Sequence, residues 1–104
     1  MIDVKFLPEY FSTSVWIKSK DIFVPIEEYN RLALSEQLIK ELEKFDDAVM
    51  DILDWDNPGG ESPMSFEERR NLYETAKDLC RRLKDELGDY YNVIDCTHWL
   101  EPKE

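Results

Sequence analysis

The chain has 104 residues, of which 42% are hydrophobic and 12% aromatic, so it is long enough for one hydrophobic core and too short for two. We therefore expect a single domain over residues 1–104. The 24 acidic residues outnumber the 13 basic ones and give a net charge of −11, which disfavours binding to nucleic acid and to anionic lipid. No apolar run approaches the roughly 20 residues of a membrane span, and the first residues lack a signal-peptide pattern, so we expect a cytoplasmic protein.

The N-terminal third of the chain predicts β-structure. Residues 2–7 alternate apolar and polar side chains and end at a proline, which cannot donate a hydrogen bond to a sheet. Residues 11–18 alternate in the same way, and the short link between the two segments suits an antiparallel hairpin. Residues 21–24 favour a third short strand, which Pro25 places at a sheet edge or brings to its end. Residues 25–32 predict a single helical turn.

Two amphipathic helices are predicted next. Ser35 is the expected N-cap of the first, and the Asn-Pro-Gly-Gly sequence at residues 57–60 is expected to end it. The second opens at Ser65 with a Ser-x-x-Glu capping box and ends at Gly88, where a glycine with positive φ is common. The apolar side of the first helix holds Leu38, Leu42, Phe45, Val49 and Ile52, and that of the second holds Leu72, Ala76, Leu79, Leu83 and Leu87.

Residues 90–95 predict a last strand, and the nine residues that follow are expected to lie across the surface. Each helix has one apolar side and a polar back, so each can cover a sheet but neither can be buried all round. The elements therefore predict an α+β fold, in which two α-helices pack on one face of a small antiparallel sheet of three or four strands.

The polar back of the first predicted helix is acidic. At 100° per residue, five acids lie opposite the apolar side: Glu36, Glu43, Asp47, Asp51 and Asp54. Most charge runs are solvated helix backs. However, like charges four residues apart destabilise a helix by about 0.2–0.5 kcal/mol per pair, and acids near a helix C-terminus oppose its dipole. The fold alone gains nothing from this arrangement, so a binding surface and a solvated back both stay open.

Trp55 lies between two aspartates where the first helix is expected to end. It is either a core residue that closes the helix against the sheet, which is the commoner case, or an exposed anchor, since tryptophan is enriched at binding hot spots. The same stretch imitates a calcium loop, but Pro58 occupies its fifth place, and Ser65, which has no carboxylate, its twelfth. The candidate partner-binding residues are Glu43, Asp47, Asp51, Asp54, Trp55 and Asp56.

No catalytic residue, cofactor or metal ligand is predicted. The sole histidine, His98, lies two residues from Cys96, and alternate residues on one strand seldom hold the hydrogen bond of a nucleophilic Cys-His pair. The sequence has no phosphate-binding glycine loop and no Cys or His pairs at zinc spacing. Carboxylate pairs are too common in an acidic chain to indicate acid catalysis. Cys80 and Cys96 are expected to be free thiols.

Four short patterns follow one another in an order that resembles a known class of protein. They are Ser-Val-Trp-Ile at 14–17, Leu-Ser-x-x-Leu at 34–38, Asp-Trp-Asp-Asn-Pro at 54–58, and Leu-x-x-x-Leu-x-x-Glu-Leu-Gly-x-Tyr-x-Asn-Val at 79–93. Over residues 11–94 the chain resembles the small acidic immunity proteins encoded beside polymorphic or contact-dependent growth inhibition toxins. The resemblance implies a protein that binds and neutralises a cognate toxin domain in the cytoplasm of the producing cell.

The charge pattern agrees with that implication. Many such toxins act on nucleic acid and need a basic cleft, toward which an acidic surface would steer association and which it could occupy. Five basic residues in the second helix are expected to confine the acidic surface to one side: Arg69, Arg70, Lys77, Arg81 and Arg82. Two alternatives remain, namely an adaptor that docks on a host complex through the same surface and a hydrolase that uses the carboxylates with a divalent metal.

Overall fold

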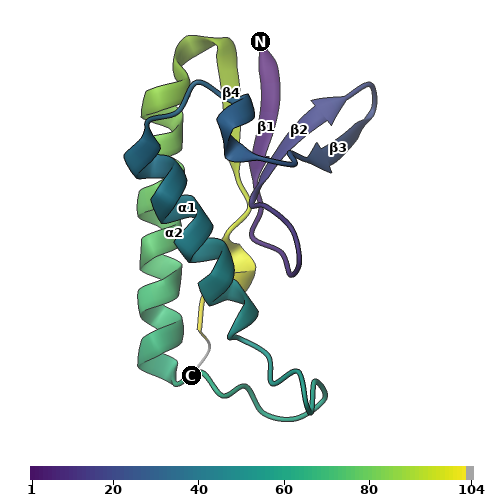
Figure 1. The fold of residues 1–104 in the computed structure, drawn as a ribbon, viewed down its shortest axis with the longest axis vertical. Coiled ribbons are helices and arrows are strands. Elements are labelled where there is room, and N and C mark those ends of the chain that lie inside the picture. Colours follow the sequence, from purple (N-terminus) through teal and green to yellow (C-terminus); the bar gives the residue numbers. More distant parts are fainter. Residues whose placement is uncertain (103–104) are drawn as a thin grey trace.

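The computed structural model describes residues 1–102 as a four-stranded sheet with two long helices on one of its faces (Figure 1). The order of the strands in the sheet is β3-β2-β1-β4. The elements are β1 (Ile2–Phe6), β2 (Val15–Ser19), β3 (Ile22–Pro25), α1 (Glu36–Met50), α2 (Phe66–Leu87) and β4 (Tyr91–Asp95), with short 3-10 turns η1 (Tyr29–Arg31), η2 (Gly88–Tyr90) and η3 (His98–Leu100). The predicted α+β class and the two helices are confirmed.

The sheet is mixed, whereas the sequence predicts an antiparallel one. β1 pairs antiparallel with β2, and β2 pairs antiparallel with β3, but β4 runs parallel to β1 with Val93 opposite Val4. The reason is the path of the chain after β3. α1 leads away from one end of the sheet and α2 returns to it, so β4 starts beside the first residue of β1 (Figure 1). A helical crossover of this kind is the usual link to a parallel strand.

The second strand begins later than predicted. Phe11 has a φ of +59°, which an extended strand does not allow, and residues 7–14 form a loop between β1 and β2. Only the end of this loop joins the ladder, where Leu7 N donates to Ser14 O at 2.7 Å. β3 is an edge strand that ends at Pro25, as predicted.

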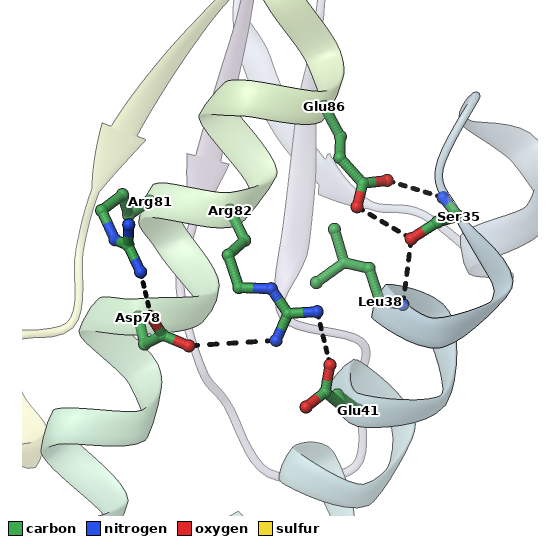
Figure 2. Close-up of polar contacts among 7 residues, drawn as sticks. All are labelled: Ser35, Leu38, Glu41, Asp78, Arg81, Arg82 and Glu86. Carbon is green, nitrogen blue, oxygen red and sulfur yellow. Dashed lines mark hydrogen bonds and ion pairs between the residues drawn. The ribbon is translucent and has the colours of Figure 1, made fainter.

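α1 begins where the sequence predicts and ends earlier. Ser35 caps it, since its Oγ accepts from Leu38 N at 3.2 Å, and the Glu86 carboxylate of α2 accepts from Ser35 N at 2.6 Å and from Ser35 Oγ at 2.8 Å (Figure 2). A helix cap of this type contributes about 1 kcal/mol. The helix stops at Met50, ahead of the Asn-Pro-Gly-Gly sequence, and the Met50 carbonyl accepts instead from Trp55 Nε1 at 2.8 Å.

α2 has both predicted ends. The capping box is complete, because Ser65 Oγ accepts from Glu68 N and the Glu68 carboxylate accepts from Ser65 N, each at 3.1 Å. These hydrogen bonds also hold the pKa of Glu68 below its usual value. Gly88 follows the helix with a φ of +72°, a conformation that favours glycine, and leads through η2 into β4.

The core lies between the sheet and the two helices. The rings of Phe6 on β1 and Phe45 on α1 stack with their centroids 5.9 Å apart. Around them lie buried side chains from the sheet and both helices, including Val4, Val15, Leu38, Leu42, Val49, Leu79 and Leu83. No helix within residues 1–102 is long and apolar enough to cross a bilayer.

The C-terminal segment is part of the folded structure, although the sequence predicts that it lies across the surface. Leu100 is fully buried at the end of the core, and Trp99 Nε1 donates to the Pro8 carbonyl at 2.9 Å. Arg69 of α2 donates to the carbonyls of Leu100 and Trp99 at 2.8 and 2.9 Å. The expectation was wrong because these contacts join residues distant in sequence. Residues 103–104 of this segment lie outside the described part of the chain.

Candidate partner-binding surface

The acidic residues predicted to contact a partner are all exposed and lie along the C-terminal half of α1 and the loop after it. We call Glu43, Asp47, Asp51, Asp54 and Asp56 the α1 ridge. Because α1 ends at Met50, only two of them lie on the helix; Asp51 is its C-cap, and the last two lie in the following loop. Glu36, which the helical period places on the same side, lies at the opposite end of α1 in its first turn.

The carboxylates of the α1 ridge form no ion pairs within residues 1–102, in contrast to Glu41 of α1 and to Asp78 and Glu74 of α2. In the part of the chain that the structure describes, none of the ridge carboxylates lies within 4.0 Å of a basic group. By contrast, Arg82 reaches across from α2 to Glu41 at 2.5 Å, and Arg81 contacts Asp78 (Figure 2). α2 contains six acidic and six basic residues, so it holds no surplus of positive charge for the ridge.

Trp55 lies at the surface beside the ridge. Its ring is 43% exposed, so the core position that the sequence favours is wrong for this residue. The centroid of the ring lies 4.8 Å from that of Phe11, which is 78% exposed, and 5.5 Å from that of Tyr10. Exposed aromatic rings of this kind are common anchors of protein interfaces. Phe11 was not predicted, because its alternation with polar neighbours indicates a strand and not an exposed loop.

Two grooves flank α1 and divide the ridge between them. Groove A, of about 860 Å³, lies between α1 and residues 25–30 and includes Glu43 and Asp47 of the ridge. Groove B, of about 1100 Å³, lies between α1, α2 and the loop that joins them. It includes the other three acids of the ridge, Trp55, and the basic residues Lys44 and Arg82. The surface is therefore a ridge with a depression on each side.

Groove A contains a carboxylate that sequence reasoning missed. Asp46 accepts hydrogen bonds from Ser14 Oγ at 2.5 Å and from the Tyr29 hydroxyl at 2.6 Å, and Ser14 N donates to the same hydroxyl at 2.8 Å. Burial raises the pKa of Asp46 to about 6 against the two hydrogen bonds, which lower it. The nearby charges of Asp47 and Glu43 raise this pKa further. Burial also raises the pKa of Tyr29.

The raised pKa of Asp46 predicts a pH-dependent stability. The folded protein binds a proton on this carboxyl more tightly than the unfolded chain, whose pKa is near the ordinary 3.8. Its contribution to the free energy of unfolding therefore falls as the pH rises from about 4 to about 6, by at most about 3 kcal/mol. Urea unfolding at several pH values should show the wild type losing stability relative to Asp46→Asn over that interval. A difference that stays constant with pH would contradict this assignment.

The loop after α1 contains an internal hydrogen bond. The Asp54 carboxylate accepts from Asp56 N at 3.0 Å. Within residues 1–102 no three side chains of the metal-ligating types converge on one point. The surface around α1 thus offers charge, exposed aromatic rings and two grooves, which are features of a binding site for another protein.

A family model described as Serratia CdiI immunity protein-like matches residues 2–97, a range that includes all four strands, both helices and the six predicted contact residues. No curated protein matches the sequence at a significant level. The resemblance to immunity proteins of contact-dependent growth inhibition systems is confirmed. The chain belongs to the Serratia CdiI immunity protein-like family.

Proposed function

We propose that this protein binds a cognate toxin domain in the cytoplasm and neutralises it by occupying the toxin's cleft. The protein carries out no chemistry of its own. Membership of the immunity family supports a toxin as the partner. The observation that carries the choice of surface is the α1 ridge, whose carboxylates form no ion pair within residues 1–102, beside the exposed rings of Phe11 and Trp55.

Charge and exposed aromatic rings each favour this surface for binding. Acidic side chains on one side of a small protein speed the encounter with a basic partner and fix its orientation. Exposed aromatic rings then supply most of the binding free energy once they are desolvated. A toxin that acts on nucleic acid must bind phosphates and so carries a basic cleft. We therefore propose a basic, nucleic-acid-targeting toxin, whose cleft the α1 ridge enters.

The partner can be identified by co-purification. A tagged copy is expressed in the native host and purified at low and at moderate salt, and bound proteins are identified by mass spectrometry. We expect a basic toxin domain that is lost as the salt concentration rises, because salt screens the attraction. Recovery of a housekeeping complex in its place would favour an adaptor and contradict the proposal.

Charge reversal on the ridge tests the surface. The double variant Asp47→Lys/Asp51→Lys should bind the toxin domain roughly tenfold or more weakly, with a smaller dependence of affinity on salt, because it places like charges at the interface. Both residues are exposed, so the fold should survive. Affinity is measured by calorimetry at several salt concentrations, and function by the growth of cells that produce the toxin domain.

A matched control separates the ridge from net charge. Asp85→Lys/Asp89→Lys changes the net charge by the same amount at the opposite end of the molecule, where α2 meets η2. This variant should keep its affinity within about threefold and should still protect cells, since distant charges are largely screened. If both double variants weakened binding equally, the ridge would have no special role.

A further inference from the structure

Groove A has an apolar part and a strongly acidic part. Ile26, Ile39 and Met50 lie along it, together with five carboxylates and no basic residue: Glu27, Glu28, Glu43, Asp46 and Asp47. Glu27 has a partner at the rim, since Arg31 lies 3.2 Å away, and both side chains are exposed. The carboxylates on the α1 side of the groove have no such neighbour within residues 1–102.

Groove B shows how this protein neutralises carboxylates in a similar setting. The guanidinium of Arg82 lies between Glu41 of α1, at 2.5 Å, and Asp78 of α2, at 3.9 Å (Figure 2). The Arg82 side chain is 26% exposed and spans from α2 to α1. Groove A offers carboxylates beside α1 in the same way, but no side chain among the described residues reaches them with a positive charge.

Asp46 is fixed in position at this groove. Ser14 and Tyr29 each donate a hydrogen bond to one of its oxygens, so the carboxylate is already oriented. Its raised pKa reflects burial first and then the negative charges of Asp47 and Glu43. A cation placed in this groove would therefore be attracted by all three carboxylates, of which Asp46 is already oriented.

We infer that groove A seats an arginine or lysine side chain of the toxin. The aliphatic part of that side chain would lie against Ile26, Ile39 and Met50, and its charged end would reach the carboxylates of α1. Long basic side chains combine an apolar stem with a charged head, which fits a groove that is apolar along part of its length and acidic along another. This inference rests on the proposed function for the identity of the partner.

A short peptide tests the groove without the toxin. Acetyl-Ala-Arg-Ala-amide is titrated into isotopically labelled protein, and the backbone amide signals are followed by NMR. Its control is the same peptide with citrulline, which has the shape of arginine and no charge. We expect saturable shifts at Ser14, Tyr29 and Asp46 with the arginine peptide, and binding roughly tenfold weaker with citrulline.

Matched variants locate the effect. Glu43→Gln/Asp47→Asn removes charge beside groove A, whereas Asp51→Asn/Asp54→Asn removes the same charge beside groove B. The first variant should bind the arginine peptide, and the toxin domain, roughly tenfold more weakly, and the second should leave peptide binding within about twofold. Equal shifts with citrulline, or no loss in the first variant, would overturn the inference.

The two proposals fail in different ways. If the protein binds the arginine peptide in groove A but no toxin co-purifies with it from cells, the groove assignment holds and the proposed function fails. If the toxin domain binds the wild type and Glu43→Gln/Asp47→Asn equally well, the groove assignment fails and the proposed function stands.

Discussion

Replacement of Trp55 by alanine is expected to weaken toxin binding by about 2–4 kcal/mol, which is roughly 30- to 1000-fold in affinity. The ring lies 43% exposed beside Phe11 and next to the α1 ridge, so it can be buried fully when a partner covers it. Tryptophan gives a large apolar area at a small loss of side-chain freedom, which is why it dominates many interfaces. Calorimetry with the purified toxin domain measures the change.

Two controls separate contact from structure. Phe66→Ala removes a ring of almost equal exposure, 44%, at the start of α2 from a residue that lines neither groove, and should leave the affinity unchanged. Trp55→Phe keeps an aromatic ring but removes the donor to the Met50 carbonyl, so it reports on the end of α1. Should Trp55→Ala bind the toxin within about threefold of the wild type, the aromatic pair would not be the anchor.

Leu100→Ala is expected to lower the free energy of unfolding by about 2–5 kcal/mol, the range for large-to-small changes in a core. The side chain has no exposed surface, and the turn η3 that carries it is held by Arg69. Urea unfolding followed by circular dichroism gives the value. The exposed neighbour Glu101 is the control, since Glu101→Ala should change stability by less than about 0.5 kcal/mol.

The outcome for Leu100→Ala decides how the C-terminal segment is regarded. A loss below about 1 kcal/mol would mean that the segment covers the core without closing it. A loss in the expected range would mean that residues 96–102 are as much a part of the fold as β4. Truncation before Trp99 would then destabilise the sheet as well, because the indole of Trp99 holds the chain after β1 through the Pro8 carbonyl.

Local chemistry made much of the fold predictable. The capping box at Ser65, the N-cap at Ser35 and the glycine after α2 each act within a few residues, so the sequence alone locates those helix ends. The parallel pairing of β4 with β1 depends on the course of two helices and could not be read from any short pattern. The early end of α1 likewise depends on Trp55 folding back to the Met50 carbonyl.

The candidate site was predictable in its charge and not in its shape. The helical period places Glu43 and Asp47 on the exposed side of α1, and the structure agrees. Asp46 escaped notice, although it lies four residues after Leu42 and three before Val49, at the border of the apolar side. A carboxylate at that border is a signal for a buried polar group. Phe11 had no such signal, because its positive φ is set by the loop around it.

The repulsion within the α1 ridge gives salt opposite effects on folding and on binding. In the free protein, Glu43, Asp47 and Asp51 repel one another along one helix side, and added salt relieves this repulsion. In the proposed complex, the same salt weakens the attraction to a basic toxin. A dilute medium thus gives a less stable protein that finds its partner faster. At the ionic strength of the cell, the protein must therefore be both stable enough to stay folded and fast enough in binding its toxin.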